Sequence, residues 1–165
     1  MNEKGELCAF TRYDYHKGFY RDDDPLNVLE HTYYSDFFEL PDDDEFPYDT
    51  ARPLLCGSCH LFALSLNKVL GYTPFIIEGT NGGGFHCFCQ LYGNNRWFYV
   101  DARGITSSFS EFMDEAKTFV SKEYIIRQVT SEDIEEWNND EKYVDEALSF
   151  AEAVIQKYKE CYVFP

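Results

Sequence analysis

Residues 85–102 read "FHCFCQLYGNNRWFYVDA" and constrain the fold more than any other stretch of the chain. Two runs rich in aromatic residues flank "GNN", a pattern that indicates two antiparallel strands joined by a tight turn. If Gly93 and Asn94 form a two-residue turn, His86 lies directly opposite Asp101 and the two side chains are in contact. A four-residue loop would leave them diagonal on one face, whereas a three-residue loop would place them on opposite faces.

The alternation along these two strands also divides their residues between two faces of the sheet. Successive strand residues point to opposite sides, so His86 and Asp101 share one face. The other face is expected to be the apolar core face and to hold Cys87, Cys89, Leu91, Phe98 and Val100.

A mostly apolar stretch, "CGSCHLFALSLNKVLGY", precedes the hairpin at residues 56–72. Ser58 can cap a helix from about Cys59 to Leu70, and Gly71 suits its C-terminal end. The helix is expected to be central and buried. Cys59 then lies in the first turn, where the positive end of the helix dipole lowers the pKa of a thiol.

The remaining pattern predicts an α+β domain with a small, largely antiparallel sheet. The expected elements are a strand over 73–79, a flexible loop over 80–84, a helix opened by the capping box Ser108–Glu111, a strand over 124–129 and an amphipathic helix over 140–161. We expect one domain, residues 1–165, with an acidic aromatic-rich segment (1–50), a core (51–130) and a C-terminal helical segment (131–165).

The net charge of −16 is unevenly spread along the chain. Residues 1–50 hold 14 acidic and 4 basic residues, and residues 111–165 hold 14 and 6, whereas residues 51–110 hold 2 and 4. Acidic flanks make bare nucleic acid and anionic membrane poor partners and favour a basic protein surface. They also serve simply to keep a chain in solution.

The expected cellular location rests on two sequence patterns, that of a signal peptide and that of a membrane-spanning segment. "MNEKGELCAF" has no basic region followed by an apolar run, and no apolar stretch is long enough to span a bilayer. We expect a cytoplasmic protein with reduced thiols, so that the six cysteines need not form disulfides.

Cys59, His86 and Asp101 together have the residue types of a thiol triad. A carboxylate fixes the tautomer and orientation of an imidazole and stabilises its protonated form. The imidazolium in turn holds the cysteine as a thiolate, which attacks acyl carbons. The Cys59 N–H at the helix start is a candidate donor to the oxyanion.

The order of these residues resembles the transglutaminase-like branch of the papain-like fold. The match is carried by "GSCHLFALSLNKVLGYTP", with Ala63 and the Gly71–Pro74 ending, and by "FHCFCQLY" and "WFYVDARG"; it spans about residues 57–104. The resemblance implies a core in which the central helix bearing the cysteine packs on a small antiparallel sheet. It also implies thiol acyl transfer: peptide or isopeptide hydrolysis, deamidation or transamidation.

Other interpretations of the same residues stay open. Cys56 and Cys59 form a C-x-x-C pair at a helix start, as in thioredoxin-like sites, although no core strand precedes them. Zinc could be held by four thiolates, at Cys56, Cys59, Cys87 and Cys89. Structural roles are also open: a buried small hydrophobe for Cys59, a satisfied core histidine for His86, and a hairpin-end cap or a partner for Arg103 in the case of Asp101.

Two further features bear on substrate binding. Gly82, Gly83 and Gly84 are expected to form a mobile lip over the thiol, where missing side chains let a substrate backbone approach, or else a plain hairpin connection. His60 follows Cys59 but points about 100° away around the helix, which predicts a residue at the rim of the pocket or on the surface.

The resulting prediction is a cysteine hydrolase with Cys59 as nucleophile, His86 as acid and base, and Asp101 as the orienting group. It requires no cofactor or metal and acts on a protein or peptide, with hydrolysis favoured over transamidation. The alternative is an acidic binding protein that mimics nucleic acid, inhibits a basic protein such as a nuclease, and uses the thiol fold only as a scaffold.

Overall fold

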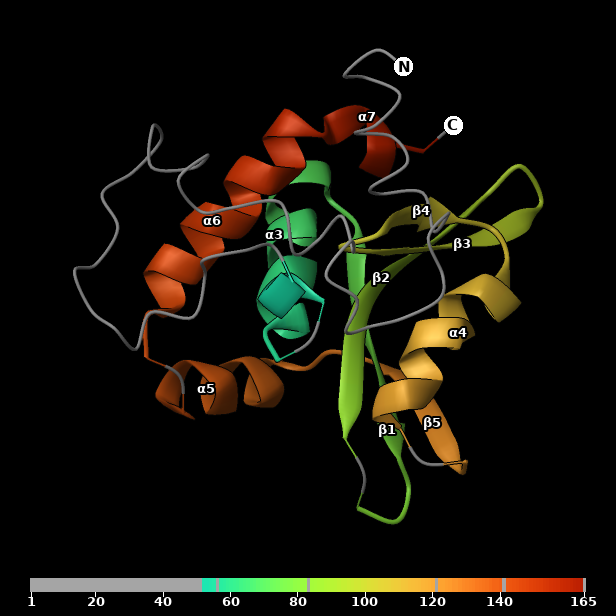
Figure 1. Ribbon diagram of the computed structural model, residues 1–165, viewed down its shortest axis with the longest axis horizontal. Coiled ribbons are helices and arrows are strands. Elements are labelled where there is room, and N and C mark those ends of the chain that lie inside the picture. The colour runs from blue at the N-terminus through green and yellow to red at the C-terminus, as the bar shows by residue number, and fades with distance from the viewer. Residues whose placement is uncertain (1–51, 56, 83, 121, 141, 165) are drawn as a thin grey trace.

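The computed structural model describes residues 52–55, 57–82, 84–120, 122–140 and 142–164 (Figure 1). The predicted acidic segment 1–50, Cys56 and Gly83 lie outside these residues. The strands are β1 Thr73–Gly79, β2 Phe85–Gly93, β3 Arg96–Asp101, β4 Gly104–Thr106 and β5 Tyr124–Gln128. The helices are the 3₁₀ turn η2 Arg52–Leu54 and the α-helices α3 Cys59–Leu70, α4 Phe109–Phe119, α5 Ser131–Asp140, α6 Val144–Lys157 and α7 Lys159–Tyr162.

The strands form one five-stranded sheet in the order β4-β3-β2-β1-β5. Each pair of neighbours is antiparallel. The predicted α+β class with a small antiparallel sheet is therefore confirmed. Neither β4 nor α5 was predicted, because β4 has three residues and the apolar residues of the acidic helix α5 are only Ile134 and Trp137.

The hairpin register differs from the predicted one by two residues. Gly93 pairs with Arg96, so the turn is formed by Asn94 and Asn95, whose φ values are 49° and 60°. Two successive positive φ angles define the type I′ turn that matches strand twist, and asparagine tolerates them. His86 is therefore not directly opposite Asp101 but diagonal to it, and a shift of two residues keeps both side chains on one face.

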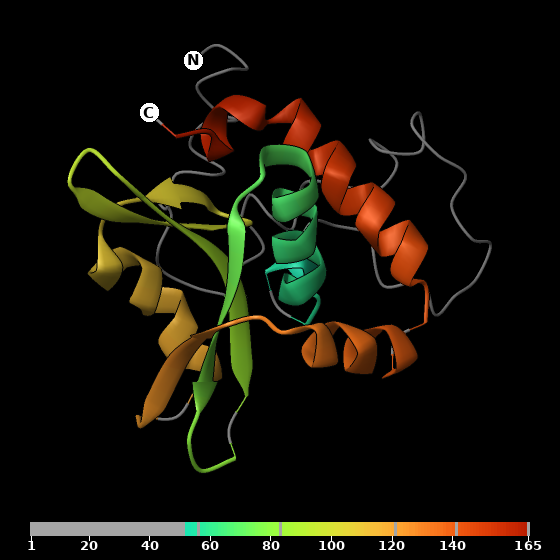
Figure 2. The ribbon, with the colours of Figure 1, turned by 180° about the vertical axis from the view of Figure 1, so that it is seen from behind.

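Helices cover both faces of the sheet, which makes two apolar cores (Figures 1 and 2). The first lies between the sheet, α3 and α6, and it includes the predicted core residues Cys87, Cys89 and Val100. The second lies between the opposite face and α4, where Ile77, Phe88, Phe112, Ala116 and Val120 pack together. The face that carries His86 and Asp101 is thus a second core rather than an open polar surface.

Helix α3 begins at Cys59 and ends at Leu70, as predicted. Gly71 adopts a φ of 74°, the left-handed conformation that ends a helix at low cost with glycine. Ser58 occupies the N-cap position, but its side chain makes no capping hydrogen bond. The Ser58 carbonyl instead accepts from the N–H groups of Leu61 and Phe62, at 3.1 and 3.3 Å.

Helix α4 starts at the predicted capping box, with one change. The Ser108 hydroxyl accepts from the Glu111 N–H at 3.3 Å, which satisfies one N–H of the first turn. The Glu111 carboxylate accepts from the Thr106 hydroxyl at 2.7 Å, and that hydroxyl accepts from the Ser108 N–H at 3.0 Å. Thr106, the last residue of β4, thus links β4 to the start of α4.

The predicted helix over 140–161 is formed by α6 and α7. Helix α6 packs along α3 through its apolar face, which consists of Ala147, Phe150, Ala151, Val154 and Ile155. It ends at Lys157, and α7 follows after Tyr158. The Tyr162 hydroxyl donates to the Ala102 carbonyl at 3.1 Å, so the C-terminal helices are also tied to the end of β3.

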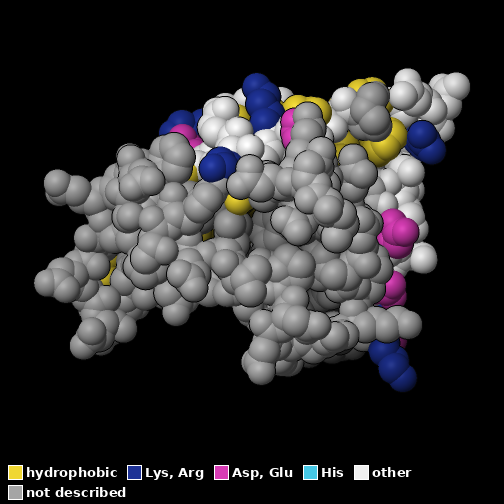
Figure 3. Space-filling view, turned by 45° about the horizontal axis from the view of Figure 1, so that its top comes forward, with side chains coloured by type: hydrophobic (Ala, Val, Ile, Leu, Met, Phe, Trp, Pro, Cys, Tyr) yellow, Lys and Arg dark blue, Asp and Glu magenta, His cyan; other side chains and the backbone are white. Residues whose placement is uncertain are grey.

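In the view of Figure 3, both basic and acidic side chains lie on the part of the surface that belongs to described residues. Among the residues described, none of the helices has the length and apolar character needed to cross a bilayer.

Candidate active site

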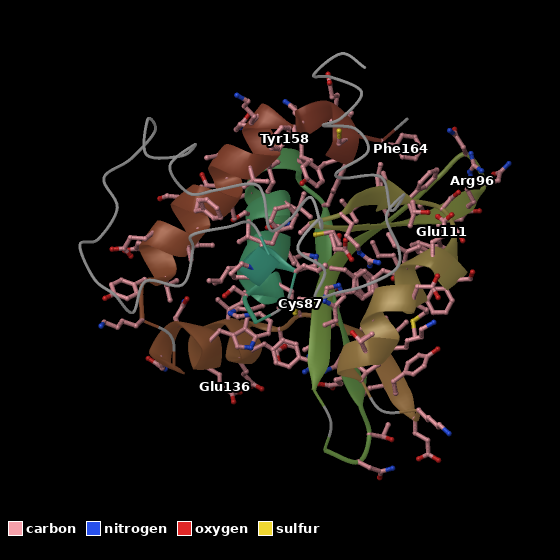
Figure 4. The ribbon with its side chains drawn as sticks, in the orientation of Figure 1. Cys87, Arg96, Glu111, Glu136, Tyr158 and Phe164 are labelled. Carbon is pink, nitrogen blue, oxygen red and sulfur yellow. The ribbon has the colours of Figure 1, made fainter. Side chains whose placement is uncertain are left out.

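The Cys59 sulfur lies against the edge of β2, just beyond the end of β3. Pairing between β2 and β3 stops at Cys89 and Val100. Two residues further along, the Cys87 N–H donates to the Cys59 sulfur at 3.3 Å. The sulfur therefore takes the position that a carbonyl of β3 would have had if that strand continued. In Figure 4, Cys87 lies close to the lower end of α3.

His86 and Asp101 meet as the sequence predicted, although in a different register. His86 Nε2 lies 3.1 Å from Asp101 Oδ2, and both side chains are buried, with 0% and 2% exposed. The imidazole also packs on Phe112 of α4, at 6.0 Å between ring centroids. Because Nε2 faces the carboxylate, Nδ1 is the ring nitrogen that can exchange a proton with a sulfur.

Asp101 also binds Arg103, as expected if the aspartate has a structural role. The Arg103 side chain donates to the carboxylate through Nη2 at 2.6 Å and through Nε at 3.1 and 3.2 Å. The Arg103 N–H donates to Asp101 Oδ1 at 2.9 Å, which closes the turn between β3 and β4. Asp101 therefore has two roles: it ends a hairpin and it anchors His86.

Arg103 is itself held in place, since its side chain is only 1% exposed. Its Nη2 also donates to the Phe112 carbonyl of α4 at 3.2 Å. The sequence indicated a neighbour for Asp101 but not that the guanidinium would be buried, because burial depends on α4 covering this face.

The pKa of Cys59 is lowered well below the usual thiol value. The largest cause is a hydrogen bond from the Cys87 side chain, and it outweighs the burial of Cys59, which would raise the pKa. Hydrogen bonds from His60 and His86, and the charge of His86, lower it further. Position at the start of α3 acts in the same direction.

The pKa of His86 is raised to about 9. Burial alone would lower it, but hydrogen bonds to Asp101 and Cys59 and their negative charges favour the imidazolium. Burial would raise the pKa of Asp101, yet the charge of Arg103 and hydrogen bonds from His86 and Arg103 hold it well below its usual range. The directions of these pKa shifts favour a thiolate, an imidazolium and a carboxylate beside the Arg103 guanidinium, charges that alternate in sign.

His60 is buried, with 2% of its surface exposed, so the prediction of a rim or surface position is wrong. Its ring lies 4.8 Å from that of Trp137 on α5 and 6.2 Å from that of Phe85. Phe85 and Trp137 also stack on each other at 6.0 Å. The cause is α5, which brings Trp137 over the start of α3 and whose position the sequence pattern did not reveal.

The predicted glycine lip lies in the turn between β1 and β2. Gly82 and Gly84 are exposed, and Gly82 has a φ of 74°, whereas Gly83 is outside the described residues. The turn is anchored at its start, because Thr80 N–H donates to the Glu123 carbonyl at 3.0 Å and Asn81 donates to the Glu123 carboxylate at 3.0 Å. Contact between these glycines and a substrate stays a prediction.

The thiols that the zinc interpretation required are held in other ways. Cys89 donates from its sulfur to the Ala63 carbonyl at 3.3 Å, and burial raises its pKa strongly. Burial also raises the pKa of Cys87. Within the described residues, no group of three or more candidate ligands is placed to hold a metal ion. The C-x-x-C interpretation depends on Cys56, which is not described.

Fold and site together define an α+β domain with a buried cluster of Cys59, His86, Asp101 and Arg103. Comparison with known proteins adds no relative, since no family model, curated protein or solved structure matches the chain.

Proposed function

We propose that this protein is a cysteine-dependent acyl-transfer enzyme, and that α3, β2 and β3 form a papain-like core of the transglutaminase-like type. One observation carries the proposal: the residue after His86 binds the Cys59 sulfur at 3.3 Å, while His86 itself binds Asp101 at 3.1 Å. A peptide, isopeptide or side-chain amide is the proposed substrate, and water is the proposed acceptor.

In the first half of the reaction, the Cys59 thiolate attacks the carbonyl carbon and the carbonyl electron pair moves to oxygen. The Cys59 N–H belongs to the first helical turn, where N–H groups lack carbonyl partners within the helix, so it can donate to this oxyanion. The His86 imidazolium gives its proton to the leaving nitrogen, the carbon–nitrogen bond breaks, and a thioester remains on Cys59.

In the second half, neutral His86 takes a proton from water, and the resulting hydroxide attacks the thioester carbon. The sulfur leaves as a thiolate and the acid product is released. Asp101 stays ionised throughout because Arg103 is bound to it. The proton therefore moves between His86 and the substrate and does not pass to the carboxylate.

Burial sets a condition on this chemistry. Cys59 is 5% exposed and His86 is fully buried. A carbonyl carbon reaches the sulfur only when the covering residues move, so substrate entry is expected to limit the rate.

Alkylation by iodoacetamide, mapped to single cysteines by mass spectrometry across pH, tests the proposal. Cys59 should react well below pH 8, the pH range in which ordinary thiols are slow. His86→Ala should slow the reaction at neutral pH by about tenfold or more, because each unit of pKa changes the thiolate fraction tenfold. Cys161, a buried thiol on α7, serves as the internal control that reacts only on unfolding.

Three results would contradict the proposal: Cys56 reacting faster than Cys59, no cysteine reacting quickly, or a Cys59 rate that does not depend on His86.

If no cysteine reacts quickly, the acidic binding role is favoured. One observation supports that role: α5 exposes Glu132, Glu135 and Glu136 and holds no basic residue, and Glu136 projects from α5 in Figure 4. A binding protein would retain its affinity for a lysine-rich peptide in Cys59→Ala and lose it at high salt.

A further inference from the structure

Cys59 and Cys87 are buried neighbours on two different elements, α3 and β2. The Cys87 backbone nitrogen lies 3.3 Å from the Cys59 sulfur. Both side chains belong to the apolar core between the sheet and α3. The Cys87 sulfur is three bonds away from this nitrogen, so the two sulfurs need little backbone movement to form a bond.

The other described cysteines are directed elsewhere. Cys89 lies on the same face of β2 as Cys87, but its sulfur donates to the Ala63 carbonyl at 3.3 Å, one helical turn further along α3. Cys161 belongs to α7, the last helix of the chain, which packs against α6 and β4. Among the described residues, Cys87 is therefore the cysteine placed to react with Cys59.

We propose that Cys59 and Cys87 form a redox modification site, in which hydrogen peroxide converts the two thiols into a reversible disulfide. The bond would withdraw the Cys59 sulfur from acyl chemistry while the fold stays intact. The proposal shares with the proposed function only the reactivity of the Cys59 thiolate, and it needs no substrate.

The chemistry has two steps. The Cys59 thiolate attacks one peroxide oxygen, the oxygen–oxygen bond breaks, and the hydroxide that leaves takes up a proton, which gives a sulfenic acid on Cys59 and one water. The Cys87 sulfur then attacks the Cys59 sulfur, the sulfur–oxygen bond breaks, and the leaving hydroxide combines with the Cys87 proton to give a second water. Two thiols lose two electrons in all, and the peroxide gains them.

Placement of Cys87 also determines what happens to Cys59 under further oxidation. A sulfenic acid without a neighbouring thiol is oxidised to sulfinic acid, which thiol reductants do not restore. The contact with Cys87 supplies that thiol within the same chain. A dithiol reductant then returns both sulfurs to the starting state by exchange.

The test treats the full-length protein with hydrogen peroxide and maps every cysteine by non-reducing and reducing mass spectrometry. In wild type, a Cys59–Cys87 cross-link should appear, alkylation of Cys59 should be lost, and dithiothreitol should restore it. In Cys87→Ser the cross-link should be absent, and Cys59 should pass to sulfinic acid without recovery. Cys89→Ser, the matched change on the same strand face, should behave as wild type.

Cys87→Ala repeats the experiment without a new hydroxyl, and circular dichroism shows that each variant is folded. A cross-link from Cys59 to Cys56, or sulfinic acid formation in wild type at the rate seen in Cys87→Ser, would overturn the redox proposal. Neither result contradicts the proposed function, because that function is tested by fast, His86-dependent alkylation of reduced Cys59. Conversely, fast alkylation of Cys59 that does not depend on His86, together with an intact Cys59–Cys87 cross-link, would contradict the enzyme and leave the redox site.

Discussion

The Cys87 N–H donates to the sulfur of Cys59 at 3.3 Å, at the point where β3 stops and β2 continues. This hydrogen bond joins the start of α3 to β2 one residue from His86. The two candidate catalytic residues, Cys59 and His86, therefore lie near the same edge of β2, although α3 covers one face of the sheet and His86 belongs to the other. The short length of β3 makes the site geometrically possible.

Arg103 is predicted to be essential for stability. It pairs with Asp101 at 2.6 Å inside the protein, and removing one partner of a buried ion pair leaves the other charge uncompensated. Arg103→Met should lower the free energy of unfolding by about 3–5 kcal/mol, measured by urea denaturation at neutral pH. Lys117→Met removes an exposed ion pair with Asp114 and should change it by less than about 0.5 kcal/mol. Equal effects of the two changes would show that the buried pair contributes little.

Asp101 is predicted to make stability depend on pH in acid. Its folded pKa lies well below the usual value of about 4, so it stabilises the fold above pH about 4, and this contribution is lost as the pH falls toward the folded pKa. Wild type should therefore be more stable than Asp101→Asn at neutral pH, and the difference should narrow below pH about 4. Thermal unfolding of wild type and Asp101→Asn across pH measures this difference in stability. A difference that stays constant across the acid range would contradict the assigned pKa.

The turn at Asn94 and Asn95 is predicted to depend on positive φ angles. Asn95 has a φ of 60°, a conformation that costs about 1–2 kcal/mol for residues with an ordinary side chain and little for glycine. Asn95→Ala should lower the free energy of unfolding by about this amount, whereas Asn95→Gly should preserve it. If alanine and glycine are equally tolerated in chemical denaturation, the turn is formed by other residues than the register indicates.

Periodicity predicted most of the core. The helix Cys59–Leu70 and the strand Thr73–Gly79 have the predicted bounds, because apolar pattern, glycine and proline all agree there. The pairing of His86 with Asp101 was predicted correctly for a reason that was partly wrong. The turn lies one residue later than expected, and the two-residue shift of register preserved the shared face.

What the sequence could not predict depends on elements that arrive from elsewhere in the fold. Arg103 is buried because α4 covers it, and His60 is buried because α5 brings Trp137 over it. Each is a tertiary contact with a distant segment, and the local sequence pattern does not indicate which segment that is. Access of a substrate to Cys59 belongs to the same class of property and stays a prediction.

Nitrogen NMR of the His86 imidazole across pH tests the central claim most directly, since it reports the protonation of the ring itself. His86 is expected to titrate at a pKa of about 9, and this pKa should fall in Cys59→Ser because a serine hydroxyl does not ionise beside it. A His86→Gln spectrum assigns the signal. An imidazole that titrates near its usual value of about 6.5 in both proteins would contradict the account, because the ring would then hold no thiolate.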